Sequence, residues 1–242
     1  MLYRWSSSRA ALFCANSEFM RKWSIEIGLA ADQIVVSYPP VEAAAESEQG
    51  LEVRQGPVRV GIVGQVIPSK GHSDLFHAVA SLSAEGCSLE LHVYGTGPSE
   101  HVQEVHRLAY AVGITSIVHF HGFERSRARI YRNLDVVAVP TRDKEAFGLA
   151  AAEPALWGLP VVLPRAGGLV EVVVDEKTGL FYRHRDIDDL TSKLRALVES
   201  AELRHRLGAA AKDYVSEHFA LASIIDRYED TLHSLACKQR PR

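Results

Sequence analysis

From Val58 onward, short apolar and often β-branched runs alternate with longer stretches in which apolar residues recur at helical spacing. This alternation constrains the fold more than any other feature, because it is typical of a parallel β-sheet wrapped by helices. The runs are continuously apolar, as expected for strands covered on both faces. We predict strands at residues 58–63, 89–94, 117–120, 135–140, 160–163 and 179–182.

Amphipathic helices are predicted between and after these strands, at about 75–82, 102–112, 187–197, 203–214 and 223–236. Residues 1–57 show a different pattern. They contain an apolar run at 11–15, the N-cap-like pair Asn16 and Ser17, a helix to Ile27 and a strand at 34–37. The segment that follows, 42–55, indicates a linker or weakly ordered loop. We therefore expect an α/β, Rossmann-like parallel sheet with helices on both faces over 58–222, a short N-terminal segment over 1–57, and a final helix and tail over 223–242.

Length and composition exclude several classes of protein. The 242 residues, 47% of them hydrophobic and 24% charged, suit one large domain with an appendage. A formal net charge of -3 provides no basic footprint, so we expect no nucleic-acid partner. No apolar run approaches the ~20 residues of a membrane span, and the N-terminus lacks the order of a signal peptide. Three distant cysteines without CxxC spacing favour a cytoplasmic location, with peripheral attachment to the inner face of a membrane left open.

Ligands of open parallel sheets bind at the carboxyl ends of the strands, so the loops that follow the strands hold the candidate residues. The first loop spans residues 64–71 and combines glycines, Lys70 and a helix start, which suits a phosphate, although a plain turn fits as well. The second loop, with Gly95 and Gly97, lacks the third glycine of a dinucleotide fingerprint and predicts only a turn.

The fourth loop, residues 141–149, carries the strongest pattern and leads into a helix that contains Glu153. Glu145 and Glu153 are eight residues apart across this junction, so both carboxylates can face one crevice and accept hydrogen bonds from sugar hydroxyls. The N–H groups of 147–149 would point at a phosphate. Two solvated acids near a helix start are the plainer alternative. After the fifth strand, Gly167 and Gly168 permit a close backbone approach to a ligand.

Together these residues resemble the C-terminal domain of the GT-B retaining glycosyltransferases called family 4, over about residues 11–228. The most specific part is 135–171, where the family's E-x7-E element falls on Glu145 and Glu153. Its G-R-L-x-x-x-K-G element falls on 64–71 and its F-x-G turn on 120–122. The remaining matches are Gly158, Pro160, Val161, Gly167, Gly168 and Glu171.

The resemblance implies that Lys70 binds the diphosphate of a nucleotide sugar, that Glu145 contacts the transferred sugar, and that Glu153 binds the ribose. Lys70 and Glu145 are thus the implied catalytic residues. It implies a nucleotide-diphosphate sugar as donor substrate, no metal, no further cofactor, and a glycan, lipid or small-molecule acceptor. The implied donor-binding residues are Gly64, Gln65, Lys70, Gly122, Phe123, Glu145, Phe147, Gly148, Leu149 and Glu153.

Two departures keep an alternative open. The family has arginine where Gln65 stands, which removes a cation from the leaving diphosphate, and Arg165 is a candidate replacement. A complete family member also has an N-terminal acceptor domain, of which we expect most to be absent here. The chain could therefore be a non-catalytic donor-binding remnant, or a subunit whose partner chain supplies the acceptor domain. An epimerase of the same fold is disfavoured, because the E-x7-E element belongs to the transferases.

Two further groups of residues are interpreted as structural. His119 and His121 flank Phe120 and point to one face of a strand, a spacing that can bind metal, but no third ligand accompanies them in the sequence. We interpret them as structural or adjacent to a nucleotide base. The arginines of the 125–132 segment lie on a short predicted helix and are interpreted as a solvated face.

Overall fold

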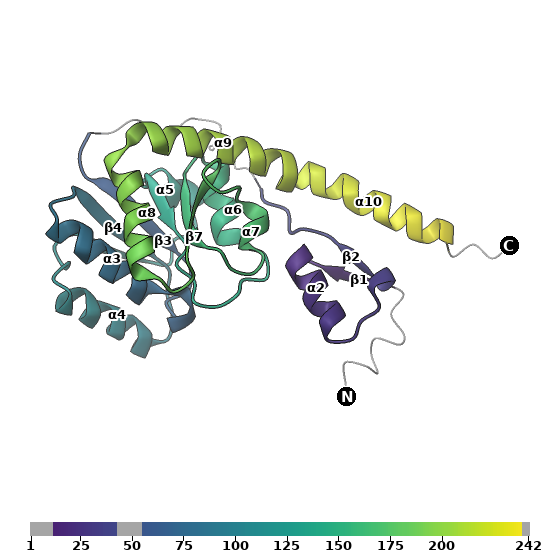
Figure 1. The fold of residues 1–242 in the computed structure, drawn as a ribbon, viewed down its shortest axis with the longest axis horizontal. Helices are drawn as coiled ribbons and strands as arrows, with labels where there is room; N and C mark the ends of the chain where they lie inside the picture. The colour runs from purple at the N-terminus through teal and green to yellow at the C-terminus, as the bar shows by residue number, and fades with distance from the viewer. Residues whose placement is uncertain (1–11, 43–54, 239–242) are drawn as a thin grey trace.

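The computed structural model describes residues 12–42 and 55–238, and its main body is a six-stranded parallel sheet (Figure 1). The strand order is β5-β4-β3-β6-β7-β8. All six predicted strands are confirmed, with ends that differ by a residue or two. Their bounds are β3 Val58–Val63, β4 Leu89–Tyr94, β5 Val118–Gly122, β6 Val136–Ala138, β7 Val161–Pro164 and β8 Gly179–Tyr182.

Helices pack against both faces of this sheet, leaving one face of β4 and β5 open, and each face has its own apolar core. On one face pack α3 (His72–Ala84), α4 (Ser99–Ala111) and α8 (Ile187–Glu199). On the other pack α5 (Arg127–Tyr131), α6 (Leu149–Leu156) and α9 (Ala201–Phe219), with the short α7 (Leu169–Val172) beside them. In β7, Val161 and Leu163 enter one core while Val162 enters the other. Burial of alternate residues on opposite faces explains the continuously apolar runs and confirms the predicted fold class.

The strand order places a crevice between β3 and β6. Sequence order runs outward from this point in both directions, since β4 and β5 lie on one side and β7 and β8 on the other. Neighbouring strands whose crossovers leave to opposite sides form a topological switch point, and loops diverge there at the carboxyl ends. The two loops that flank the switch point follow β3 and β6.

The described part of the N-terminal segment forms a small parallel strand–helix–strand unit. β1 (Phe13–Ala15) pairs with β2 (Ile34–Val36), and α2 (Glu18–Glu26) joins them. The Ser17 hydroxyl accepts a hydrogen bond from the Met20 N–H at 3.0 Å, which confirms the predicted helix cap. The predicted linker falls almost entirely within 43–54, which lies outside the described residues, as do 1–11 and 239–242.

The final helix, α10 (Leu221–Lys238), leaves the end of α9 and extends away from the six-stranded sheet, past the β1–β2 unit (Figure 1). The Val41 N–H donates to the Phe219 carbonyl at 2.8 Å, so the passage after β2 and the passage between α9 and α10 touch. Within the residues that the structure describes, no helix combines the length and apolar character needed to cross a membrane.

Candidate active site

The two loops at the switch point bring Lys70 and Glu145 into direct contact. The Lys70 Nζ donates to the Glu145 Oε1 at 2.5 Å, and both side chains are partly exposed. Lys70 ends a 3-10 turn (Pro68–Lys70) after β3, and Glu145 lies in the loop after β6. A lysine and a carboxylate that are 75 residues apart in the sequence thus meet where the predicted crevice requires them.

Gly71 allows the loop after β3 to pass tightly against the end of β6. Its φ is 72°, in the left-handed region, and a Cβ there would lie 1.8 Å from the Pro140 carbonyl oxygen. The Thr141 hydroxyl and the Arg142 N–H both donate to the Ser69 carbonyl, at 3.1 and 2.8 Å. Only glycine fits this approach, which fixes the position of Lys70.

Gly167 and Gly168 hold the backbone of Glu145. The Gly168 N–H donates to the Glu145 carbonyl at 2.8 Å, and a Cβ on Gly167 would lie 2.3 Å from that oxygen. A Cβ on Gly168 would lie 2.4 Å from the Ala146 carbonyl oxygen. The predicted close backbone approach therefore exists, but its partner is the 145–146 segment of the same chain. The paired glycines position the acid.

A second cation–acid pair lies beside Lys70 and was not predicted. The Arg142 guanidinium donates to both carboxylate oxygens of Asp74, at 2.8 and 3.0 Å, and Asp74 is buried at the start of α3. The hydrogen bond to Asp74 raises the pKa of Arg142. The acid comes from the helix after β3 and the arginine from the loop after β6, so this pair ties together the two loops of the switch point.

Glu153 is held by α5 and does not meet Lys70 directly. Its carboxylate accepts from the Arg127 guanidinium at 3.0 Å and from the Tyr131 hydroxyl at 2.9 Å. The hydrogen bond to Glu153 raises the pKa of Arg127, and burial raises the pKa of Tyr131. Arg127 and Arg129 are exposed, as the interpretation of a solvated face predicted, and each also pairs with an acid, since Arg129 lies 3.7 Å from Glu124.

A pocket of about 580 Å³ gathers three of the predicted donor-binding residues, Gly64, Gln65 and Phe123. Phe123 is 70% exposed, so its ring is available to a ligand. Gly122 precedes it with a φ of 67° and forms the turn at the end of β5. Ile130 of α5 also lines the pocket, next to the Tyr131 that binds Glu153.

The turn with Gly95 and Gly97 forms one wall of this pocket. A Cβ on Gly95 would lie 1.8 Å from the Gly64 carbonyl oxygen, and one on Gly97 would lie 2.1 Å from that of Val66. The sequence predicted a turn here without assigning it a place in the site. The signal was present in the two glycines, which are needed where adjacent loops meet.

The remaining predicted residues, Phe147 to Leu149, lie at the start of α6. The Phe147 side chain is buried against Tyr38 and Phe219, with ring centroids 5.7 and 5.2 Å away. Gly148 caps the helix with a φ of 121°, and Leu149 is exposed. Any contact of 147–148 with a ligand would involve the backbone, because the first N–H groups of a helix have no helical partner.

Glu171 joins the two units of the protein. Its carboxylate accepts from the N–H groups of Glu18 and Phe19, both at 2.8 Å, and from the Tyr38 hydroxyl at 2.9 Å. Burial and the hydrogen bond to Glu171 raise the pKa of Tyr38. The acid therefore occupies the N-terminus of α2, where negative charge is favoured.

Arg165 does not replace the arginine missing at Gln65. Its guanidinium contacts Asp175 at 2.5 Å and lies over the Phe181 ring, 4.6 Å from the centroid. These partners hold it at the β7–β8 side of the sheet. The backbone of Arg142 contacts the loop that contains Lys70, since its N–H donates to the Ser69 carbonyl, and its guanidinium binds Asp74 at the start of α3.

Comparison with known proteins tests the resemblance. The family model for glycosyl transferases group 1 matches residues 44–214, which is most of the chain. The chain belongs to this family. A D-inositol 3-phosphate glycosyltransferase of Corynebacterium kroppenstedtii is 32% identical over 220 residues, which cover 86% of this chain and 48% of that protein. An MMP alpha-(1->4)-mannosyltransferase of Mycolicibacterium hassiacum is 32% identical over 183 residues, 72% of this chain and 42% of that protein.

This group 1 chain spans less than half the length of the curated relatives described above. Among solved structures, Anabaena Alr3699/HepE in complex with UDP and glucose has a TM-score of 0.84 at 23% identity, covering 96% of this chain and 65% of that one. Sucrose-phosphate synthase of Thermosynechococcus elongatus has a TM-score of 0.81 at 21% identity, covering 97% and 61%. These likenesses confirm the GT-B type of α/β fold.

Proposed function

We propose that this chain binds a nucleotide-diphosphate sugar and forms the donor-binding part of a family 4 retaining glycosyltransferase. The observation that carries the proposal is the Lys70–Glu145 contact at the switch point of the sheet. Lys70 shares the loop after β3 with Gly64 and Gln65, which line a pocket together with Phe123. A cation beside an acid, at a site where ligands of such sheets bind, suits a ligand that is part diphosphate and part sugar.

Each group then has a distinct task. The Lys70 ammonium neutralises charge on the diphosphate as the bond to the sugar breaks, and the first turn of α6 offers further N–H donors. Glu145 orients Lys70 and accepts hydrogen bonds from sugar hydroxyls. Glu153 exchanges one of its present donors for the ribose hydroxyls, while the exposed Phe123 ring meets the base. Uridine and guanosine diphosphate sugars are the donors to test first, and a glycan, lipid or small molecule is the acceptor.

Such a site works without a covalent nucleophile. The departing diphosphate is stabilised electrostatically while the acceptor hydroxyl attacks the same face of the sugar, so the anomeric configuration is retained. Preorganised cations and N–H groups suffice for this, because they cost no reorganisation when charge develops. Gln65 provides no charge here, so Lys70 carries more of this work than it would beside an arginine.

A second candidate function is a donor-binding remnant or a subunit of a split transferase. Gln65 favours it, since the position lies in the pocket and lacks a cation. In this candidate the acceptor domain is supplied by another chain. Donor hydrolysis or transfer by the purified chain alone would contradict this candidate.

The main experiment is a thermal-shift panel of nucleotide sugars on the wild type and on Glu153→Ala. We expect one donor to stabilise the wild type, because a ligand that binds only the folded state raises its melting temperature. Glu153→Ala should lose most of this shift. Glu199→Ala, which removes an exposed acid from the end of α8, is the matched control and should keep it. If no donor stabilises the wild type, or if both variants respond equally, the proposed function is wrong.

A further inference from the structure

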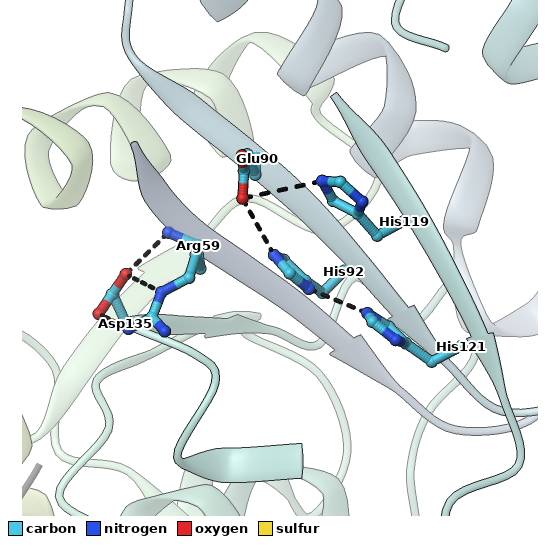
Figure 2. Close-up of polar contacts among 6 residues, drawn as sticks. All are labelled: Arg59, Glu90, His92, His119, His121 and Asp135. Carbon is cyan, nitrogen blue, oxygen red and sulfur yellow. Dashed lines mark hydrogen bonds and ion pairs between the residues drawn. The ribbon is translucent and has the colours of Figure 1, made fainter. Parts of the chain in front are cut away.

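The open face of β4 and β5 carries a cluster of one carboxylate and three imidazoles. In the register of these parallel strands His92 lies opposite His119, and Glu90 lies two residues before His92 on the same face. Figure 2 shows the Glu90 carboxylate facing the rings of His92 and His119, with His121 on the side of His92 that is away from Glu90. The sequence displayed only the His119–His121 pair, because the third and fourth groups come from a strand about 30 residues earlier.

The distances in this cluster resemble those around a bound metal ion. Glu90 Oε2 lies 3.5 Å from His92 Nε2 and 3.7 Å from His119 Nε2, and all three ligand atoms lie within 4.8 Å of one another. Nitrogen and oxygen ligands at about 2.0–2.1 Å from a tetrahedral zinc ion are separated by about 3.4 Å. The two distances from Glu90 are therefore already close to this value. The distance between the Nε2 atoms of His92 and His119 reaches it by rotation of His119, whose side chain is 44% exposed.

His92 is prepared to act as a ligand through its Nε2 atom. The residue is 9% exposed, and its Nδ1 lies 2.9 Å from His121 Nε2, which leaves Nε2 directed at Glu90. Within the described parts of the chain, this buried Nε2 has no hydrogen-bond partner. When Nδ1 donates its proton to His121, the lone pair of Nε2 is free to bind a metal ion.

The cation on the adjoining strand β3, Arg59, directs its hydrogen bonds to Asp135 and not to Glu90. Its guanidinium contacts the Asp135 carboxylate at 2.7 and 2.9 Å (Figure 2). The carboxylate of Glu90 therefore faces the two imidazoles. Two imidazoles and one carboxylate suit zinc and its transition-metal neighbours, whereas magnesium and calcium prefer oxygen ligands.

We propose that Glu90, His92 and His119 form a binding site for a divalent transition-metal ion, with Zn²⁺ the best fit, and that His121 positions His92 from outside the ligand set. The three ligands come from β4 and the edge strand β5, so the ion fixes β5 to the sheet. The site lies on the face of the sheet, away from Lys70 and Glu145. It therefore stands whether or not the chain transfers sugar.

The test uses the full chain without an affinity tag, stripped with a chelator and returned to Zn²⁺ by equilibrium dialysis. We expect one Zn²⁺ per chain and a higher melting temperature when the ion is bound. Co²⁺ in its place should show the intense visible absorption of a tetrahedral nitrogen and oxygen site. None of these measurements depends on transferase activity.

Variants assign the ligands. His119→Ala removes an exposed ligand, and Glu90→Gln changes one carboxylate oxygen to an amide, so both should fold and both should lose stoichiometric binding. His121→Ala should weaken binding by about 10- to 100-fold, as is usual for a residue that orients a ligand. His106→Ala is the matched control, because this exposed histidine stacks on Phe120, at the other face of β5, and should bind Zn²⁺ like the wild type.

The outcomes are separable. Loss of binding in His119→Ala, with His106→Ala unchanged and both variants folded by circular dichroism, supports the site. Absence of stoichiometric Zn²⁺ binding by the folded wild type overturns it. Binding by His119→Ala within about threefold of the wild type also overturns it, because the ion must then lie elsewhere.

Discussion

The carboxyl edge of the sheet and the open face of β4 and β5 both collect polar side chains, but they hold them in different ways. At the edge, three acids each have a basic partner: Glu145 has Lys70, Glu153 has Arg127 and Asp74 has Arg142. On the face, one carboxylate stands among three imidazoles, two of which have lowered pKa values. The carboxyl edge thus consists of ion pairs, whereas the face of β4 and β5 consists largely of neutral imidazole rings.

This difference indicates what each region can bind. Ion pairs at loop tips can open and exchange a partner for an anionic or hydroxylated ligand, with little cost because water reaches them. Neutral imidazoles gathered around a carboxylate offer lone pairs to a cation. The two regions are thus expected to respond to different ligands and different substitutions, and four measurements test that separation.

The largest effect is expected at the edge, in turnover. Lys70→Ala should lower kcat by about 10²- to 10³-fold, since the loss of one preformed electrostatic contact to a departing group has this size. Glu145→Gln should have an effect of similar order, and the double variant much less than the product, because the two act as a unit. Transfer is measured with the donor identified in the thermal-shift panel.

Lys193→Ala on α8 provides the control for removal of a lysine and should retain wild-type turnover. If Lys70→Ala keeps kcat within a few fold, then Lys70 does not stabilise the leaving group. The edge would in that case bind a ligand without catalysing its transfer.

The next effect is on the stability of the protein at acid pH. It distinguishes a buried histidine at the edge, His72, from one on the face, His92. Burial and the nearby Lys70 lower the pKa of His72 to about 4. The unfolded chain binds this proton near pH 6.5, so lowering the pH from 6.5 to 4 favours unfolding. His72→Gln removes this proton and should flatten the decline by about 1.4 kcal/mol per pH unit within that window.

Urea unfolding of the wild type and His72→Gln at several pH values between 7 and 4.5 measures this slope. His92, whose pKa is also lowered to about 4, remains in the variant and should preserve part of the decline. Identical slopes in the two proteins would show that His72 is not buried in its neutral form.

A smaller effect, on stability, is expected at Glu171, which lies near the edge but holds the small N-terminal unit to the rest of the protein. Glu171→Gln replaces a charged acceptor of two N–H groups and one hydroxyl, and should lower the free energy of unfolding by about 1–3 kcal/mol. The melting temperature should fall by several degrees. Calorimetry measures this change, and the donor-induced shift should persist. Loss of donor binding at unchanged stability would instead assign Glu171 to the ligand site.

The smallest effect is expected when the face is changed and the edge is observed. His119→Ala should leave the donor-induced thermal shift within experimental error of the wild type, because the ring lies on a strand surface away from the donor loops. A donor affinity that changes tenfold in this variant would mean that the two regions are coupled through β4 and β5.

The edge was largely predictable from the sequence, because the rule that places ligands at strand ends needs only the strands and their loops. Continuous apolar runs located the strands, and the loops after the first and fourth supplied Lys70 and Glu145. The partners of Glu153 and Glu171 were not predictable. They depend on how α5 and α2 pack against the sheet, and no local pattern encodes such packing.

The face was missed for a different reason. His119 and His121 were visible as a pair, but Glu90 and His92 become their neighbours only through the pairing of β4 with β5. Register between parallel strands is set by the packing of the whole sheet and is not visible in either strand alone. The same limit explains why Gly167 and Gly168 were assigned to a ligand, when their neighbour is the backbone of 145–146.

The contact between Val41 and Phe219 has a mechanical consequence. The chain leaves the β1–β2 unit through 37–41 and returns toward it through 219–221, and these two passages are hydrogen-bonded to each other. Together with the hydrogen bonds of Glu171 to α2 and Tyr38, this contact attaches the small unit to the large one at two separate places. Two attachments restrain rotation as well as translation, so the small unit is expected to move with the large one, and a cross-link between 41 and 220 should add little rigidity.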